Sequence, residues 1–283
     1  MLLRDYRPYD PAELRIERIA GDAPNPRERE AMDARALEFL QTMSLDDYVT
    51  AKGGLDWAAS FIRQVIERLA TPPRGTILEF GAGNAKLAAV LSTLPEVEEV
   101  VINDFSEPLL TELAPRVISW LGGDLTKIRL LIGDMHAAPD LDQRFDAVVT
   151  YLAVHHLVLP EHFFARLGNI LAPGAPFIAF REPALARHPL PTELTRRVQR
   201  NIHELRRSGE NEHRYTIDGY ARLSASDFDF ELLGVHNGAM FLSPRSERVS
   251  RLVAPVPYDI AYALHQRNQL ATKPSSSDRQ SGS

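Results

Sequence analysis

The chain has 283 residues and no cysteine, so disulfide bonds and thiolate metal ligands are excluded. Its net charge of −6 argues against a dedicated nucleic-acid binder, because such proteins need basic surface. No apolar run approaches the roughly 18 residues of a membrane span, and the first ten residues lack the apolar core of a secretory signal. We therefore expect a cytoplasmic protein that needs no membrane.

Residues 1–71 are predicted to form an N-terminal arm and a helical cap. Residues 1–24 are expected to be extended with little regular structure, since they contain Pro8, Pro11 and Pro24. Asn25-Pro26 begins a helix, because it combines a capping side chain with proline in the first turn. Apolar residues at helical spacing then predict helices over about 26–43, from Ser44, and over about 55–69.

From Gly75 onward, short apolar runs alternate with segments of helix length. The predicted strands are Thr76–Phe80, Val97–Asp104, Ile128–Ile132, Phe145–Tyr151 and Pro176–Phe180. These runs lack polar alternation, as expected of strands covered on both faces. Helix-length connections imply parallel strands with right-handed crossovers. The predicted fold is a doubly wound α/β domain over residues 72–272, with a mostly parallel, seven-stranded sheet and an antiparallel edge strand.

The C-terminal third is predicted to continue this domain and then to end in a polar tail. The expected elements are a helix over about 191–207, two antiparallel edge strands over 228–235 and 239–242, and helices over 246–252 and 258–270. Residues 273–283 are serine-rich and polar, which is typical of disorder.

The residues that end the predicted strands are the candidates for a ligand site. In an open parallel sheet, ligands bind beyond the carboxyl ends of the strands, where the strand order reverses. Glycines at positions 81 and 83 would let a ligand approach the backbone. Asp104, at the tip of the second strand, can accept hydrogen bonds from a ribose, and Asp134, after the third, from an exocyclic amine. The alternatives are a helix-capping acid and a turn acid.

Two residues around the first turn distinguish a dinucleotide site from another kind. A dinucleotide-binding turn requires a third glycine where Lys86 stands. Glu79, just before the turn, would repel a pyrophosphate and suits a ligand that carries positive charge. A nicotinamide-dependent dehydrogenase is therefore a weaker hypothesis.

Taken together, Glu79-x-Gly81-x-Gly83, Asp104, Gly133-Asp134 and Leu171-Ala-Pro-Gly174 resemble the class I S-adenosylmethionine-dependent methyltransferases. The resemblance covers about residues 75–182 and extends more loosely to about 243. One departure is Ala85, which stands where the family often has another glycine.

The resemblance implies S-adenosylmethionine as the cofactor, and it implies a role for each matching residue. Gly81 and Gly83 would lie against the amino-acid end of the cofactor, and Glu79 would help to place its ammonium group. Asp104 would hold the ribose. The adenine would be contacted by Asp134, Met135 and Phe105, and Tyr151 would line the floor near the methyl group.

The expected activity is methyl transfer to oxygen or nitrogen of a small molecule, with secondary metabolism as one setting. His155 and His156 follow the fourth strand and are candidate bases, although a structural role is the more usual one for such a pair. Arg181 is the best-placed candidate to bind the acceptor. Other candidates for that role are Tyr48, Trp57, His188, Tyr215 and His236.

Three alternatives remain open at this point: an RNA or protein methyltransferase, a protein that binds S-adenosylmethionine without transferring methyl, and the dehydrogenase. The expected partner is a small-molecule acceptor rather than nucleic acid. No metal site is predicted.

Overall fold

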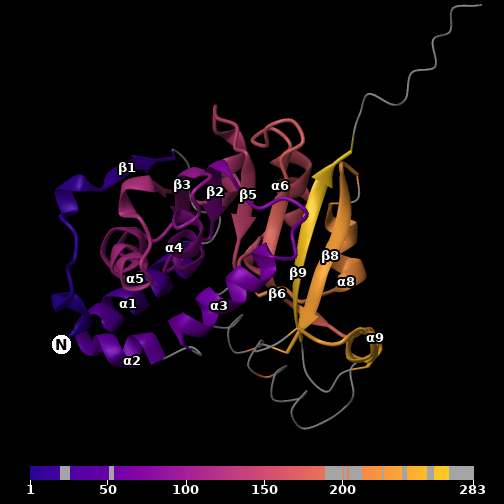
Figure 1. Cartoon of the computed structure of the whole chain (residues 1–283), viewed down its shortest axis with the longest axis horizontal. Helices are drawn as coiled ribbons and strands as arrows, with labels where there is room; N and C mark the ends of the chain where they lie inside the picture. Colours follow the sequence, from indigo (N-terminus) through magenta and orange to yellow (C-terminus); the bar gives the residue numbers. More distant parts are fainter. Residues whose placement is uncertain are drawn as a thin grey trace, which may run out of the picture.

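The computed structural model describes residues 1–19, 26–50, 54–188, 200, 203, 212–224, 226–237, 241–253 and 258–267. A sheet of nine strands runs through the described part of the chain (Figure 1). Its strands are β1 (Arg15–Arg18), β2 (Gly75–Phe80), β3 (Val97–Asp104), β4 (Ile128–Ile132), β5 (Ala147–Thr150), β6 (Phe177–Leu185), β7 (Tyr215–Thr216), β8 (Phe228–His236) and β9 (Tyr258–Gln266).

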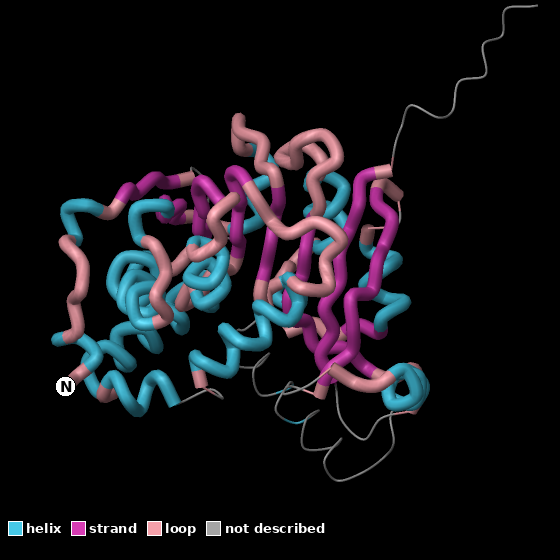
Figure 2. Tube along the Cα trace, viewed as in Figure 1, coloured by secondary structure: helices cyan, strands magenta, loops and turns pink. Residues whose placement is uncertain are grey.

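Helices flank the sheet on both sides and gather at the end where the N-terminus lies (Figure 2). The described α-helices are α1 (Pro26–Thr42), α2 (Leu45–Thr50), α3 (Leu55–Ile66), α4 (Lys86–Ser92), α5 (Ala114–Trp120), α6 (Pro160–Leu167), α8 (Ile217–Leu223) and α9 (Pro244–Leu252). A π-helical turn, Leu109–Leu113, precedes α5. No helix among the described residues is long and apolar enough to cross a membrane.

The order of the strands places a reversal at the centre of the sheet. The order is β1-β4-β3-β2-β5-β6-β9-β8, with β7 paired to β6. The chain thus enters the main sheet at β2, builds outward through β3 and β4, and returns to add β5 and β6 on the other side of β2. All pairs are parallel except those made by β9. The predicted doubly wound, mostly parallel fold is confirmed.

Side chains alternate between two buried layers, so both faces of the sheet are covered. In β2, Ile77 packs in the layer formed with α3, α4 and α5, whereas Leu78 and Phe80 pack with α6 and α8. A third cluster joins α1, α2 and the start of α3 to Leu113 and Val117 beside α5. This third cluster attaches the N-terminal helices to one end of the domain.

The strand count is nine rather than the predicted seven, because β1, β7 and β9 were not predicted as strands and the strand predicted over 239–242 is not among the nine described strands. β1 lies in the arm that was expected to be irregular, and all four of its side chains are exposed. It has no apolar pattern to reveal it, because backbone pairing with β4 holds it in place. β7 has only two residues and pairs with the end of β6.

The predicted helix over 258–270 is wrong, because residues 258–266 form β9. Ile260, Ala261, Tyr262, Ala263 and Leu264 are all buried, since the strand is covered on both faces. Such a continuous apolar run has no period that separates strand from helix. β9 is also the antiparallel strand, and it lies one position inside the edge that β8 forms. The helix predicted over 246–252 is confirmed as α9.

Three predictions fall wholly or mainly outside the described residues. They are the helix over 191–207, the strand over 239–242 and the tail over 273–283. Phe241, which is described, makes an isolated antiparallel bridge with His236.

Candidate functional site

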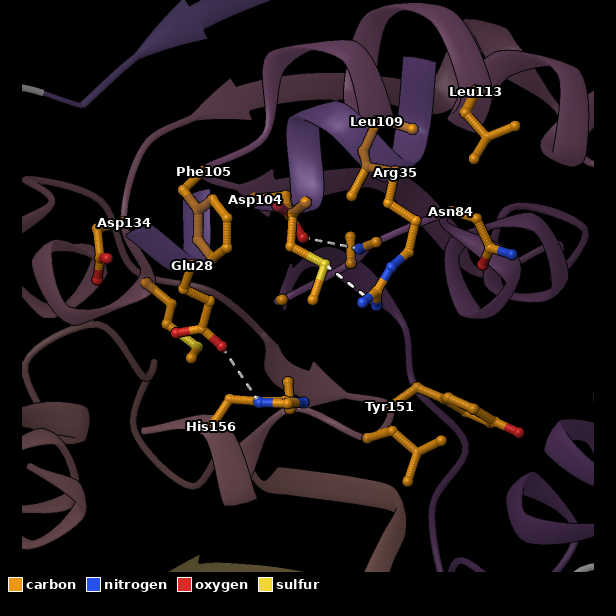
Figure 3. Close-up of a pocket in the computed structure, with 18 of the residues that line it drawn as sticks. Glu28, Arg35, Asn84, Asp104, Phe105, Leu109, Leu113, Asp134, Tyr151 and His156 are labelled. Atoms are coloured by element: carbon orange, nitrogen blue, oxygen red, sulfur yellow. Dashed lines mark hydrogen bonds and ion pairs between the residues drawn. The ribbon is translucent and has the colours of Figure 1, made fainter. Parts of the chain in front are cut away.

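A cavity of about 420 Å³ opens at the carboxyl ends of β2, β3, β4 and β5. Its wall is built from the turn after β2, the residues that follow β3, β4 and β5, one face of α1, Tyr48 of α2, and Glu212. Figure 3 shows Asp134 and Phe105 on one side of this cavity and Asn84 and Tyr151 on the opposite side. The cavity therefore lies at the central reversal of strand order, where the sequence predicts a ligand site.

The two glycines of the turn after β2 both have a left-handed backbone. Gly81 has a φ of 60° and Gly83 a φ of 54°. A Cβ atom on Gly81 would lie 2.4 Å from the Cβ of Ala153, whereas one on Gly83 would meet no atom within 4 Å. Gly81 is thus required by packing, and Gly83 leaves the backbone accessible from the cavity. Ala85 is also left-handed, with a φ of 57°.

Glu79 lies behind this turn and is not part of the cavity wall. Its side chain is buried, and the backbone N–H of Ala88 in α4 lies near enough to lower its pKa. The second carboxylate oxygen, Oε2, has no hydrogen-bond partner. Burial raises the pKa of Glu79 to about 8, although Lys86 and the Ala88 N–H oppose this shift. A group with positive charge placed near Oε2 would favour the ionised form.

Asp104 ends β3 and joins two turns of the site. Its Oδ2 accepts the Gly83 N–H at 2.8 Å, and its Oδ1 accepts the Ser106 N–H at 3.0 Å. Each carboxylate oxygen retains a second acceptor position, because an ionised carboxylate offers about four. Burial raises the pKa of Asp104 to about 6, with the two N–H donors opposing it.

Asp134 begins a 3-10 turn and also forms a fixed pair with His136. Its Oδ1 accepts the backbone N–H of His136 at 2.8 Å and lies 2.5 Å from the Nδ1 of that ring. The Val158 N–H donates to Nε2 at 3.0 Å, which assigns the ring proton to Nδ1. Met135 and Phe105 line the cavity beside this pair. The turn role and a ligand role are therefore compatible at Asp134.

Tyr151 forms part of the cavity wall and conceals Arg181. The Tyr151 hydroxyl accepts a hydrogen bond from Arg181 Nη1 at 3.3 Å, and Lys86 Nζ lies 4.5 Å from the centre of its ring. Arg181 also donates to Asp259 Oδ2 at 2.7 Å and lies over Trp57. Arg181 is not among the residues that line the cavity. It supports Tyr151 from behind.

The two predicted histidines have different surroundings. His155 is buried, its Nδ1 lies 2.9 Å from Glu182 Oε2, and burial lowers its pKa. His156 lines the cavity, and its Nδ1 lies 3.4 Å from Glu28 Oε1 (Figure 3). Of the two, only His156 is positioned to contact a molecule in the cavity.

Leu152, which lies between Tyr151 and the two histidines, has an unusual backbone. It follows Tyr151 directly and has a φ of 58°. Its N–H donates to the Arg181 carbonyl at 2.9 Å. Left-handed conformations are costly for residues other than glycine, and they gather at functional sites. Here the turn directs Tyr151 and Ala153 to the cavity wall.

The stretch of chain that carries these strand-end residues matches a known family model. Residues 77–174 match the family model described as a methyltransferase domain. This match places a methyltransferase domain at residues 77–174. No curated protein matches the sequence.

Solved structures with the fold of this methyltransferase domain differ widely in sequence. The YcgJ protein from Bacillus subtilis is 16% identical with a TM-score of 0.53, over 74% of this chain and 99% of that chain. The DhpI protein, in a complex named DhpI-SAM-HEP, is 17% identical with a TM-score of 0.52, over 87% and 100%. The [4+2]-cyclase SpnF is 13% identical with a TM-score of 0.56, over 88% and 98%. At these identities the likeness establishes the fold alone.

The methyltransferase domain has features that fit S-adenosylmethionine. The buried Oε2 of Glu79 lacks a partner, which suits a ligand that carries positive charge. The Gly83 position meets no atom on its open side, so a ligand can lie against the backbone. Asp104 has acceptor positions to spare for hydroxyl groups.

One face of α1, in the N-terminal helical cap, forms part of the cavity wall, and its individual residues were not identified from the sequence. Glu28, Met32, Arg35 and Phe39 all line the cavity. Their spacing of four, three and four residues places them on one side of a helix. The sequence carried this signal, but Glu28 reads equally well as an acid in the first turn of a helix.

Two further wall residues come from other segments. Tyr48, which was a candidate for acceptor binding, lines the cavity, and its hydroxyl accepts from Asn84 Nδ2 at 2.8 Å. Glu212 lies far from the methyltransferase motifs in the sequence, and no local pattern marks it. Of the other candidates for acceptor binding, none is among the residues that line this cavity.

Proposed function

We propose that this protein is an S-adenosylmethionine-dependent methyltransferase that transfers a methyl group to oxygen or nitrogen of a small molecule. The observation that carries the proposal is the convergence of the Gly81–Gly83 turn, Asp104 and Asp134 on one cavity. A concave site of this size with a few convergent polar groups is typical of small-ligand binding.

The proposed roles of the residues follow the cofactor from one end to the other. Gly81 and Gly83 would lie against its amino-acid end, and Glu79 would favour the positive charge there from behind the turn. Asp104 would accept from the ribose hydroxyls, while it keeps its bonds to the Gly83 and Ser106 N–H groups. The adenine would lie near Phe105, Asp134 and Met135.

Methyl transfer requires the protein to align the acceptor more than to activate it. When bound, the cofactor supplies a methyl group on a positively charged sulfur. The residues of the cavity would align the acceptor with that methyl group and exclude water, which contributes several kcal/mol to lowering the barrier. A base is needed only when the acceptor atom carries a proton that must leave. His156 would face such an acceptor, and Tyr151 would close the cavity below it.

The small-molecule class is supported by the wall that α1 and α2 add to the cavity. A polynucleotide or a folded protein would need a wide approach to the methyl group, and the net charge of −6 gives nucleic acid no general attraction. The proposed location is the cytoplasm. A complex named for SAM and a second ligand, that of DhpI, has the same fold.

The second candidate is a protein that binds the cofactor for another reaction. The observation that favours it is the fold likeness to a solved structure that is named as a [4+2]-cyclase.

Two measurements, made one after the other, test the proposal. Calorimetry should detect binding of S-adenosylmethionine and none of NAD; the opposite result would favour a dehydrogenase. The protein is then incubated with an extract of the source organism and cofactor labelled on the methyl group, and the labelled product is identified by mass. Cofactor binding with no labelled product in any fraction would favour the second candidate.

A further inference from the structure

Two adjacent histidines and three buried glutamates meet beside the cavity, and we call them the histidine–acid cluster: Glu28, His155, His156, Glu182 and Glu212. We propose that this cluster binds a divalent transition-metal cation of the zinc type, with His155, His156 and Glu212 as ligands. The proposal goes beyond methyl transfer, since the cation would bind whether or not the cofactor is present.

The first support is the way in which Glu182 holds His155. Glu182 is fully buried, and its oxygens accept the backbone N–H groups of Ala153, Val154 and His155 at 2.9, 3.0 and 3.3 Å. The same carboxylate accepts from Nδ1 of His155 at 2.9 Å. Because the proton is thereby held at Nδ1, the lone pair of His155 is at Nε2. A carboxylate behind an imidazole in this way is the usual support of a metal-bound histidine.

The second support is the spacing between the proposed ligand atoms. Nε2 of His155 lies 4.0 Å from Oε1 of Glu212, which is too far for a hydrogen bond. Two ligand atoms bound roughly 2.1 Å from one tetrahedral ion would be about 3.4 Å apart. The ligand atoms of His155, His156 and Glu212 all lie within 4.8 Å of one another. A small rotation of the Glu212 side chain would bring them to coordination distance.

The third support is the charge of the cluster. Glu28 Oε1 lies 3.4 Å from His156 Nδ1, so a third carboxylate adds to those of Glu182 and Glu212. Opposite them, Arg214 Nη2 lies 3.1 Å from Glu212 Oε2. Carboxylates that gather at a buried place favour a cation among them, so the charge of this cluster suits a divalent ion.

The set of ligand atoms selects the class of cation. It also indicates the direction that the open coordination position faces. Two imidazoles and a carboxylate suit zinc and its neighbours, whereas magnesium and calcium prefer oxygen alone. Catalytic zinc sites have three protein ligands and a fourth position for water or substrate. His156, Glu28 and Glu212 line the cavity, so that fourth position would face it. An oxygen or nitrogen atom of a second ligand would bind there.

The test is a titration of tag-free, chelator-stripped full-length protein with Co²⁺ alone, followed by visible absorption. One equivalent should bind and give the intense bands of a four-coordinate site, and Zn²⁺ should displace it. Glu212→Gln and His156→Asn should each weaken Co²⁺ binding by roughly tenfold or more. Both residues lie at the cavity wall, so their substitution spares the buried Glu182 network.

The chain offers a matched control in a second histidine–glutamate pair. His265 Nε2 lies 2.9 Å from Glu231 Oε2 on the surface, and His265→Asn should leave Co²⁺ binding unchanged. Thermal denaturation of the metal-free variants verifies that each is folded. Absence of a stoichiometric site in the wild type would overturn the proposal and leave the carboxylates to contact a cationic acceptor instead. Unchanged affinity in Glu212→Gln and His156→Asn would overturn it as well.

Discussion

The two ends of the cavity are built in different ways. The proposed cofactor end, formed by Glu79, Gly81, Gly83 and Asp104, comes from successive strand ends, and backbone N–H groups fix the Asp104 carboxylate. The histidine–acid cluster draws on residues from 28 to 212, and within it backbone N–H groups hold Glu182, while ion pairs join the other side chains. The first end is a property of the local β–turn–α unit, and the second is a property of the whole packed chain. Substitutions should therefore affect stability and binding at the first end, and turnover at the second.

The largest expected effect is electrostatic and concerns Glu79. Its pKa is about 8 in the folded protein and near 4.5 in the unfolded chain, so between these values the folded state binds more protons. The free energy of unfolding should therefore fall as the pH rises from about 4.5 through about 8, by several kcal/mol in total. Glu79→Gln should remove this fall while weakening cofactor binding. Urea denaturation over this pH range measures the effect.

Asp104 also makes the free energy of unfolding fall as the pH rises, over a lower pH range, because its pKa is raised from 3.8 to about 6. This part of the pH dependence should remain in Glu79→Gln. The matched control is Glu98→Gln, since Glu98 is an exposed acid on the adjacent strand β3. A Glu79→Gln profile parallel to that of the wild type would show that Glu79 is ionised in the free protein.

The two glycines of the turn provide a contrast within the cofactor end. Gly81→Ala should lower the free energy of unfolding by roughly 2–4 kcal/mol, since it combines a left-handed backbone with a contact of 2.4 Å to Ala153. Gly83→Ala should cost about 1–2 kcal/mol, because only the backbone term applies. Chemical denaturation compares them directly. Equal losses would mean that Ala153 moves aside without penalty.

The ribose contact is expected to be a smaller effect. Asp104→Ala should weaken S-adenosylmethionine binding by roughly 1–3 kcal/mol, the penalty for hydroxyls left without an acceptor. Calorimetry measures it, with Asp229→Ala on the exposed edge of β8 as the control. Unchanged affinity in Asp104→Ala would remove this residue from the cofactor site.

The smallest effect is expected at the other end of the cavity. Glu28→Gln should lower the methyl-transfer rate about tenfold, or about 1.4 kcal/mol, because Glu28 holds His156 at the cavity wall. Cofactor affinity should stay within about twofold, since Glu28 pairs with His156 of the histidine–acid cluster. Glu30→Gln is the matched control, as Glu30 is exposed on the same helix. A loss of cofactor affinity in Glu28→Gln would show that the two ends of the cavity do not act separately on binding and turnover.

The same distinction explains what could be predicted from the sequence. Asp104 and Asp134 follow apolar runs directly, so knowledge of parallel sheets is enough to bring them to one edge. The strand ends of a β–α unit are encoded within about ten residues of chain. This is why the fold, its parallel strands and the position of the cavity could be predicted.

The residues that could not be predicted depend on contacts distant in sequence. Glu212 reaches the cavity only through the packing of the C-terminal segment, and nothing in its neighbourhood marks it. Arg181 was expected to follow a strand that ends at Phe180, but β6 continues to Leu185. Asp259 of β9 and Tyr151 hold Arg181 behind the wall. β9 itself was misassigned, since an apolar run buried on both faces is compatible with either helix or strand.

β1 affects how readily the chain would aggregate. Its four residues and the Ile19 N–H pair with the outer side of β4, which would otherwise present unpaired backbone groups along one edge of the sheet. At the opposite edge, β8 carries the exposed charges Asp229 and Glu231, which discourage strand addition. One edge is therefore protected by charge and the other by a segment from the far end of the chain. A chain that lacked the first 19 residues would expose β4 to the strands of its neighbours, and its main hazard would be aggregation.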